Sequence, residues 1–293
     1  MKRSVSVIIP TTAEPCRRES LQRAIDSIRC QRHIAAELIL VVNGSRYDPS
    51  LLEELRKLPL RLMRLSEASL PAAIRSGRHA VTTEYFAFLD DDDIYLPDAL
   101  ACRVDALESG DADFVVSNGI SAAGNPLIPD IGAVESDPLR TLLVKNWLTS
   151  CGGLYRSATI SGDFFKLLVK YYEWTVLAFH LLTAGKKVRF VDCLTFRVSD
   201  TGNSASKQIS MESMLNAIAV AEYMFAHVPT DVRAGLSWKL AAVYHDTSAH
   251  CLLSGRLSQA WQMHVSSMLK GGWQYFSYTR HLVRRSCAEW FGA

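Results

Sequence analysis

The first 120 residues alternate between short apolar runs and segments in which apolar residues recur every three or four positions. The apolar runs predict five strands, at residues 4–9, 37–42, 60–65, 85–89 and 113–117. The helical spacing predicts intervening helices around residues 21–28, 51–55, 71–80 and 97–108. Because apolar strands that alternate with helices usually pair in parallel, the pattern predicts an α/β fold with a mostly parallel sheet and helices on both faces.

The pattern changes after residue 118. Residues 119–137 are rich in Gly, Pro, Asn and Asp, which predicts a long loop. Further helices are predicted at residues 138–147 and 173–184, and further strands at residues 153–156 and 188–191. A Ser/Gly/Asn-rich loop is predicted at residues 199–210, and helical spacing continues from Met211, with a helical hairpin over residues 241–269.

Composition narrows the class of protein. Apolar residues make up 48% of the 293 residues and charged residues 21%, which is typical of a globular chain. A net charge of +2 gives no global attraction to nucleic acid. The seven cysteines are odd in number and include no C-x-x-C pair, which indicates free thiols in a reducing cytosol. Since no secretory leader and no run of about 18 apolar residues is found, we expect a cytoplasmic protein.

Four consecutive aspartates, at residues 90–93, follow the predicted strand at residues 85–89. Ligands of such sheets bind beyond the carboxyl ends of the strands. Adjacent carboxylates repel one another and raise one another's pKa, and a hard divalent cation such as Mn²⁺ or Mg²⁺ relieves that repulsion. The alternative is a solvated turn before the helix that follows Pro97, with Asp98 near the helix N-terminus.

Several segments, taken in order, resemble the family 2 glycosyltransferases. The likeness lies in residues 5–11, 37–45, 84–93, 151–156 and 173–191. It extends over about residues 4–200 and implies the Rossmann-like GT-A fold. On this basis we expect a glycosyltransferase domain at residues 1–205 and a helical region at residues 206–293. The first domain divides into a nucleotide-sugar half (1–118) and an acceptor half (119–205).

The resemblance implies inverting transfer of a sugar from a nucleotide diphosphate sugar. Asp90 and Asp92 would hold a Mn²⁺ or Mg²⁺ ion that bridges the diphosphate. The implied donor-binding residues are Pro10, Thr11, Thr12, Glu14, Asn43, Arg75, Asp90, Asp91 and Arg197. Arg75 has an alternative role as an ordinary solvated arginine of a helix.

The residues for base recognition depart from the family pattern. The second strand commonly ends in paired acidic residues there, whereas this chain has Val42 and Asn43. The Asn43 side chain both donates and accepts, so its carbonyl can take the imide N–H of uracil or thymine, which favours a UDP-sugar. The alternative is that Asn43 and Gly44 only form the turn.

The family's catalytic base is an Asp that follows a Glu near a helix start. This chain has Glu173 followed by Trp174 in that region. If Glu173 aligns with the Glu, Trp174 replaces the base; if Glu173 aligns with the Asp, Glu173 is itself the base. The hypothesis is that Glu173 is the base, with Asp163 in reserve. The alternative for Glu173 is a charge at a helix N-terminus that the macrodipole favours. If neither carboxylate acts, the chain is a weak transferase or a nucleotide-sugar-binding homologue.

Aromatic and basic residues are interleaved over residues 273–291. This composition suits a helix that lies on an anionic membrane. The alternative is that the aromatic residues pack onto the catalytic domain and leave the arginines in water. The expected acceptor is a glycan or lipid-linked glycan, in bacterial surface polysaccharide synthesis, with the protein peripheral on the inner face of the membrane. A nucleotidyltransferase is the alternative enzyme class, although the chain lacks a Gly-rich, Lys-bearing N-terminal loop.

Overall fold

The computed structural model describes residues 3–199 and 209–290. Two compact units are present. Unit 1 comprises Met1–Leu142 and Asn146–Ser204, and unit 2 comprises Leu143–Lys145 and Ala205–Ala293. The predicted boundary at residue 205 and most of the predicted loop at residues 199–210 lie in the segment 200–208, outside the described residues, so both stay predictions.

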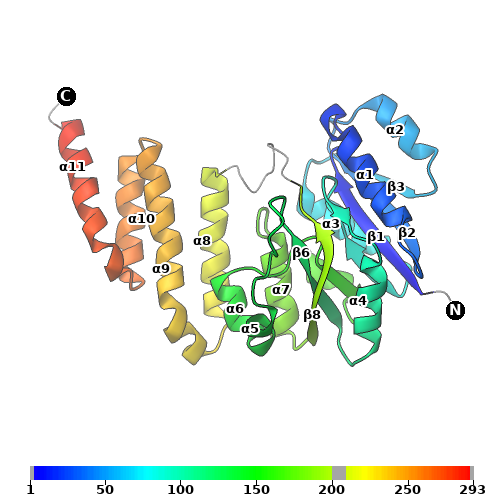
Figure 1. Ribbon diagram of the computed structural model, residues 1–293. Coiled ribbons are helices and arrows are strands. Elements are labelled where there is room, and N and C mark those ends of the chain that lie inside the picture. Colours follow the sequence, from blue (N-terminus) through cyan, green and yellow to red (C-terminus); the bar gives the residue numbers. More distant parts are fainter. Residues whose placement is uncertain (1–2, 200–208, 291–293) are drawn as a thin grey trace. The chain divides into compact units, whose positions relative to one another are not determined.

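One half of the unit 1 sheet is parallel (Figure 1). Strand β1 (Ser4–Thr11) lies between β2 (Ala35–Asn43) and β4 (Tyr85–Phe88), and β3 (Arg61–Leu65) pairs with β2 on the outer side. All of these pairs are parallel. The α/β fold and the four strands are therefore as predicted, and their carboxyl ends share one edge of the sheet.

The other half of the sheet contains the strand predicted at residues 153–156, but its antiparallel pairing was not predicted. Strand β7 (Gly153–Arg156) is inserted between β4 and β6 (Phe114–Ile120) and is antiparallel to both. Strand β8 (Val188–Arg197) is parallel to β6, and the short β5 (Ile94–Tyr95) is antiparallel to β8 at the edge. Strand β8 is longer than the predicted 188–191, with register shifts opposite residues 117–119.

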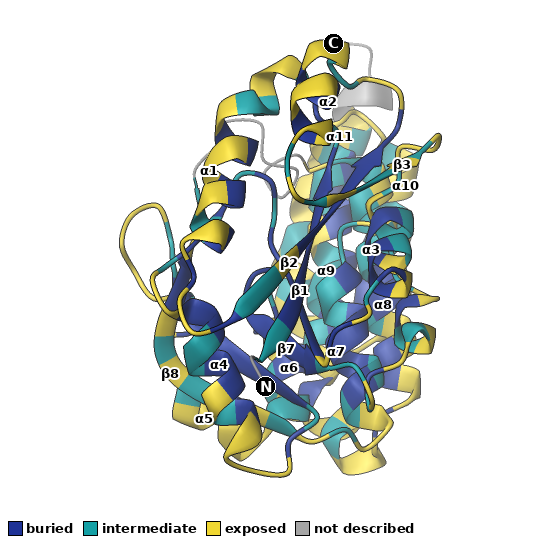
Figure 2. Cartoon of the chain, turned by 90° about the vertical axis from the view of Figure 1, so that its right-hand side faces the viewer, coloured by how far each residue is buried: buried dark blue, intermediate teal, exposed yellow. Residues whose placement is uncertain are grey.

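Helices cover both faces of the sheet (Figure 2). Alternate β1 residues pack with α1 (Arg18–Arg29) and α4 (Ala99–Glu108) in one buried cluster. On the opposite face, Gly77 of α3 (Leu70–His79) lies so close to the sheet that a Cβ atom there would be 2.3 Å from Cγ2 of Ile8. Only glycine allows this approach. The 3₁₀ turn η1 (Pro15–Arg17) precedes α1, and α2 (Pro49–Arg56) joins β2 to β3.

Three predictions for unit 1 need correction. The loop predicted at residues 119–137 contains the end of β6 and helix α5 (Ile131–Ser136). The side chain of Asp130 caps this helix by accepting from the backbone N–H of Ala133. Helix α6 (Pro138–Val144) ends before the predicted residue 147. Helix α4 begins two residues later than predicted, because Asp98 has a left-handed φ of 59°.

The remaining elements are helical. Unit 1 also contains η2 (Gly162–Phe165) and α7 (Glu173–Thr183). Unit 2 contains α8 (Met211–Ala226), α9 (Thr230–Leu253), α10 (Leu257–Leu269), η4 (Trp273–Tyr278) and α11 (Thr279–Trp290). The predicted hairpin of α9 and α10 is confirmed, and Ser248 Oγ of α9 donates to the carbonyl of Ala260 in α10. Within the described segments, we found no helix with the length and apolar character required to cross a bilayer.

Candidate active site at the carboxyl edge of the sheet

The ends of β1, β2 and β4 are joined by side-chain hydrogen bonds. Thr11 Oγ1 donates to Asp91 Oδ2 at 2.6 Å and accepts from the backbone N–H of Ala13 at 2.9 Å. Asn43 Nδ2 donates to the carbonyl of Thr11 at 3.1 Å, which fixes the amide and directs its oxygen away from Thr11. The structure thus brings together Thr11, Asn43 and Asp91, three of the predicted donor-binding residues.

The four aspartates divide into two pairs. Asp91 and Asp92 face the exit of β1, where both contact Arg17 of η1. Asp90 and Asp93 face the residues that precede β7. Asp90 Oδ2 accepts from Ser150 Oγ at 2.6 Å, and Asp93 Oδ2 accepts from the thiol of Cys151 at 3.2 Å. Each pair is therefore held by a different part of the fold.

Burial controls the protonation of the aspartate run. It raises the pKa of Asp91 and of Asp93 to about 6 and the pKa of Asp90 well above its ordinary value. The charges of neighbouring aspartates raise these pKa values further, but they are the smaller cause. A raised pKa means that the anionic carboxylate is destabilised, so a bound cation would relieve the site.

Among the described residues, Asp90, Asp93 and Cys151 form a group whose potential metal-ligand atoms lie within 4.8 Å of one another. Burial raises the pKa of the Cys151 thiol, which stays protonated and donates to Asp93 rather than acting as a ligand. The desolvated carboxylate oxygens are hard ligands and fit Mn²⁺ or Mg²⁺. Asp92, the predicted partner of Asp90, contacts Arg17 NH1 at 2.8 Å instead of joining this group.

The predicted site residues do not include Arg17, Asp93, Ser150 or Cys151. Only Asp93 carried a usable signal, because it belongs to the aspartate run. Ser150 and Cys151 reach the site through the insertion of β7 beside β4, which is a pairing between distant parts of the chain. Arg17 lies beyond the left-handed Ala13, whose φ of 49° turns the chain after β1.

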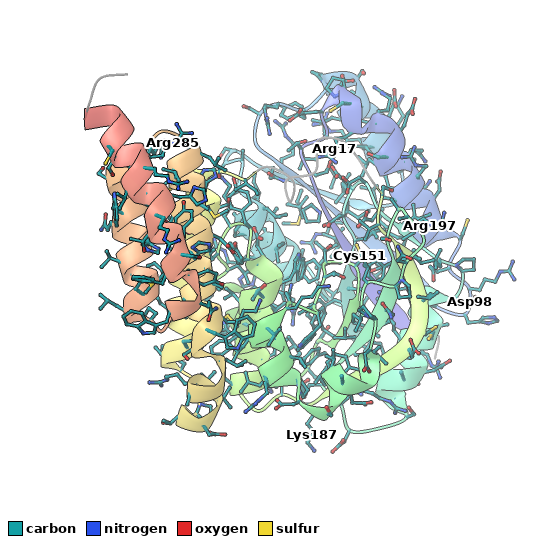
Figure 3. The ribbon with its side chains drawn as sticks, turned by 60° about the vertical axis from the view of Figure 1, so that its left-hand side comes forward. Arg17, Asp98, Cys151, Lys187, Arg197 and Arg285 are labelled. Atoms are coloured by element: carbon teal, nitrogen blue, oxygen red, sulfur yellow. The ribbon has the colours of Figure 1, made fainter. Side chains whose placement is uncertain are left out.

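The other predicted donor-binding residues lie around the same strand ends or on nearby elements. Pro10 is buried in β1, and Thr12 follows that strand. The Glu14 carboxylate pairs with Arg46 Nε at 3.0 Å. Arg197 is exposed at the end of β8, where it pairs through the backbone with Ile94, two residues after Asp92 (Figure 3). Arg75 is exposed on α3.

The two candidate bases differ in environment. Glu173, the first residue of α7, is 4% exposed, its Oε1 has no hydrogen-bond partner among the described residues, and burial raises its pKa. The next residue, Trp174, packs edge-on against Phe88 at 5.0 Å between ring centroids, which brings the start of α7 beside the end of β4. Asp163 is exposed, and Lys166 and Ser161 lower its pKa. The geometry therefore favours Glu173 as a proton acceptor.

Comparisons with known proteins agree with this architecture. Residues 6–128 match the family described as Glycosyl transferase family 2. Among solved structures, S. aureus TarS 1–349 in complex with UDP-GlcNAc is 15% identical with a TM-score of 0.63, covering 90% of this chain and 79% of that chain. The UDP complex of S. aureus TarS 1–349 is 14% identical with a TM-score of 0.57, covering 83% of this chain and 71% of that chain. No curated protein sequence gives a match.

The fold is of the GT-A class, and the family match of residues 6–128 supports a glycosyltransferase. Residues 6–128 match the glycosyl transferase family 2 model, and this segment contains the exits of β1, β2 and β4 together with the aspartate run. This assignment favours sugar transfer over the nucleotidyltransferase alternative.

Proposed function

We propose that the chain transfers a sugar from a UDP-sugar to a hydroxyl of a glycan or lipid-linked glycan, with inversion at the sugar and with the help of Mn²⁺ or Mg²⁺. The observation that carries the proposal is the convergence of Thr11, Asn43 and the four aspartates at the carboxyl ends of three parallel strands. The UDP and UDP-GlcNAc complexes of TarS, which has a similar fold, support a uridine nucleotide. A role in bacterial surface polysaccharide synthesis is part of the same proposal.

In this proposal the nucleoside lies against the exits of β1 and β2. Pro10, Thr11, Thr12 and Glu14 line it, and the oxygen of the Asn43 amide accepts the imide N–H of uracil. The orientation of Asn43 supports this role, since its nitrogen is already used by Thr11. Arg75 and Arg197 are the candidate cations for the diphosphate, because guanidinium groups bind phosphate oxygens well.

The aspartate run holds the divalent cation in this proposal, with Asp90 and Asp92 as ligands and Asp93 beside them. When bound, the cation neutralises the charge that develops on the departing UDP. Asp91 holds the run against β1 through its hydrogen bond from Thr11.

Glu173 acts as the general base. The acceptor hydroxyl oxygen forms a bond to the anomeric carbon, the bond from that carbon to the UDP oxygen breaks, and the hydroxyl proton moves to the Glu173 carboxylate. The unpartnered Oε1 supports this role, because a free lone pair can accept the proton. Asp163 is the reserve base, although its ion pair with Lys166 lowers its pKa and so favours the unprotonated form.

Thermal melting in the presence of Mn²⁺ tests the nucleotide assignment. Binding to the native state raises the melting temperature by mass action. We expect UDP to raise it more than GDP at equal concentration, and we expect Asn43→Leu to remove the difference, because leucine cannot accept the imide N–H. A larger shift with GDP, or no shift with any nucleoside diphosphate, would contradict the proposal.

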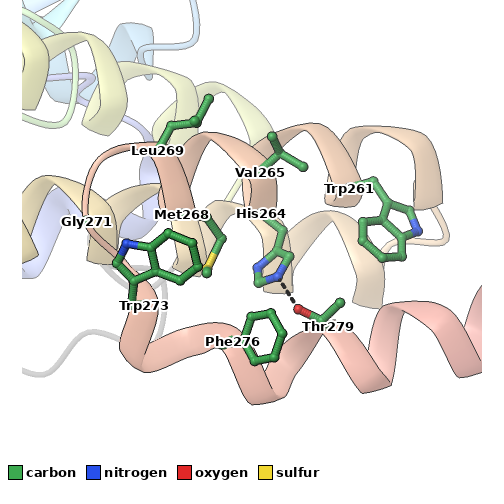
Figure 4. A pocket seen from close by; sticks show the side chains of 9 residues that line it. All are labelled: Trp261, His264, Val265, Met268, Leu269, Gly271, Trp273, Phe276 and Thr279. Atoms are coloured by element: carbon green, nitrogen blue, oxygen red, sulfur yellow. Dashed lines mark hydrogen bonds between the residues drawn. The ribbon is translucent and has the colours of Figure 1, made fainter.

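Unit 2 supports the peripheral membrane location that the tail composition predicts. A groove of about 470 Å³ lies between α10 and η4 (Figure 4), and exposed apolar side chains line it. They include Leu269, Trp273 and Phe276, which are 81%, 69% and 62% exposed. Such a contiguous apolar surface is typical of a site that contacts a partner or a membrane.

Helix α11 adds positive charge next to this groove. Leu282 is fully buried, whereas Arg280, His281, Arg284 and Arg285 are exposed. Positions 280 and 284, like 281 and 285, are four residues apart and share a helix face. We propose that this groove binds an anionic lipid surface, because cations beside exposed aromatic residues fit phosphate headgroups above acyl chains. Phe291, the last aromatic residue of the predicted tail, lies outside the described residues.

Vesicle sedimentation tests this interaction surface. The full chain should bind vesicles that contain phosphatidylglycerol and not vesicles of phosphatidylcholine alone. Trp273→Ser with Phe276→Ser should weaken binding by about tenfold or more, because it removes apolar surface that the membrane would bury. Arg284→Glu with Arg285→Glu should also weaken binding by about tenfold or more, because each charge contributes about 1 kcal/mol near an anionic surface.

Matched controls are available in unit 1, where Leu167 is 69% exposed and Arg23 and Arg32 are also exposed. Leu167→Ser and the pair Arg23→Glu with Arg32→Glu should bind vesicles like the wild type. Equal loss in these controls, or a wild-type chain that ignores anionic vesicles and instead dimerises through the groove, would overturn the membrane assignment.

A further inference from the structure

Arg17 forms a bridge over two aspartates of the candidate cation site. Its NH1 atom lies 3.1 Å from Asp91 Oδ1 and 2.8 Å from Asp92 Oδ2. The Arg17 side chain is 25% exposed, and those of Asp91 and Asp92 are 11% and 17% exposed. The guanidinium is thus a partly shielded positive charge at the mouth of the aspartate run.

The position of Arg17 conflicts with cation binding at Asp92. A divalent cation within bonding distance of the Asp92 carboxylate would lie a few ångströms from the guanidinium, and the two positive charges would repel each other. Asp90 and Asp93, in contrast, are held by neutral groups, the hydroxyl of Ser150 and the thiol of Cys151. The guanidinium of Arg17 and the divalent cation therefore compete for the Asp92 carboxylate.

Arg17 is held less firmly than a residue of the sheet would be. It belongs to the short turn η1 rather than to a strand, and a quarter of its side chain is exposed to solvent. The neighbouring Arg18 is used differently, because its guanidinium binds Asp48 and Glu54, which fastens α1 to α2. Arg17 contacts the aspartate run, whereas Arg18 contacts the scaffold.

We propose that Arg17 is a displaceable counter-ion of Asp92, which weakens the binding of a free divalent cation and moves to the diphosphate when the donor arrives. This inference rests on the proposed function, since it requires a nucleotide diphosphate at the same edge. A guanidinium freed from a carboxylate matches the two oxygens of a phosphate in the same forked geometry. The consequence is that cation and donor bind together, with little cation held by the empty site.

Binding of Mn²⁺ without nucleotide, followed by the electron paramagnetic resonance signal of the free ion, tests the counter-ion role. Arg17→Gln should bind Mn²⁺ about fivefold to tenfold more tightly than the wild type, because the competing charge is gone. With Mn²⁺ saturating, the same variant should bind UDP about tenfold more weakly, because the contact to the diphosphate is lost.

Three further variants make the test specific. Arg18→Gln removes the same charge from the adjacent residue and should leave the Mn²⁺ affinity within about twofold of the wild type, because exposed charges at a distance are screened. Arg17→Lys should lie between the wild type and Arg17→Gln. Addition of Asp92→Asn to Arg17→Gln should remove the gain in Mn²⁺ affinity.

An unchanged or weaker Mn²⁺ affinity in Arg17→Gln would overturn the inference, and a lower melting temperature with no gain in affinity would identify Arg17 as purely structural. Failure of the proposed function gives a different result. In that case no variant binds UDP, the wild type included, while the comparison of Mn²⁺ affinities still reports on Arg17.

Discussion

Replacement of Asp92 by asparagine should lower the rate of sugar transfer by at least about 100-fold, the loss typical when a group that stabilises developing charge is removed. Asparagine keeps the shape and one oxygen of the side chain but removes the negative charge that a divalent cation needs. It also removes the ion pair between Asp92 and Arg17, whose guanidinium keeps its contact with Asp91. Release of UDP from UDP-GlcNAc in the presence of Mn²⁺ and an acceptor measures the effect.

Asp98→Asn is the matched control for this prediction. Asp98 lies six residues after Asp92, is exposed (Figure 3) and caps α4 without a side-chain hydrogen bond. Its φ of 59° lies in the left-handed region, which asparagine tolerates well. Asp98→Asn should therefore keep the rate within about twofold. Full activity of Asp92→Asn, or equal loss in both variants, would remove Asp92 from the cation site.

Replacement of Glu173 by glutamine should lower the transfer rate by about 100-fold to 10,000-fold, the usual contribution of a general base. Glutamine has the same shape but cannot take up the acceptor proton at neutral pH. The affinity for UDP should stay the same, because Glu173 lies at the start of α7 and not among the donor-binding residues of β1 and β2. Transfer assays combined with UDP titrations separate the two effects.

Stability provides an internal check on Glu173→Gln. Burial raises the pKa of Glu173, so the charged carboxylate opposes folding at pH values above its folded-state pKa. A neutral glutamine removes this cost, and the free energy of unfolding at pH 8 should not fall. Asp163→Asn is the comparison variant, since Asp163 is exposed and paired with Lys166. Loss of transfer in Asp163→Asn together with full activity in Glu173→Gln would assign the base to Asp163.

The parallel half of the fold could be predicted because its information is local. Each strand from β1 to β4 is a short apolar run, and the first polar residues after each run reach the same edge whenever such strands pair in parallel. The rule places Thr11 and Asp91, which are 80 positions apart in the sequence, at the same edge, where the structure joins them by a hydrogen bond. The location of the aspartate run could therefore be predicted, but its hydrogen-bond partners could not.

The residues that escaped prediction depend on long-range structure. Strand β7 looks like any other short apolar strand in the sequence, and only the folded sheet shows that it is inserted antiparallel beside β4. That insertion delivers Ser150 to Asp90 and Cys151 to Asp93. Arg17 was equally hidden, because an arginine in a surface turn has many possible partners and only the path of the chain after Ala13 selects Asp92.

The origin of the pKa shifts in the run also needed the structure. Four adjacent aspartates suggest mutual repulsion, but burial is the first cause of the raised pKa of Asp90, Asp91 and Asp93. Burial depends on β1, β7 and the chain around Ser199, whose backbone N–H donates to Asp93 at 2.9 Å. A sequence alone does not reveal which of four identical side chains is desolvated.

The central claim is that the edge formed by β1, β2 and β4 binds a UDP-sugar together with a divalent cation. Calorimetric titration of UDP-GlcNAc into the wild type and into Asp92→Asn, with Mn²⁺ and then with EDTA, tests it most directly. We expect UDP-GlcNAc to bind saturably to one site of the wild type with a dissociation constant between about 1 μM and 1 mM, in the usual range for enzyme substrates. We also expect binding at least about tenfold weaker in EDTA or in the variant. No saturable binding by the wild type, or equal binding under all of these conditions, would contradict the joint binding of a UDP-sugar and a divalent cation at this edge.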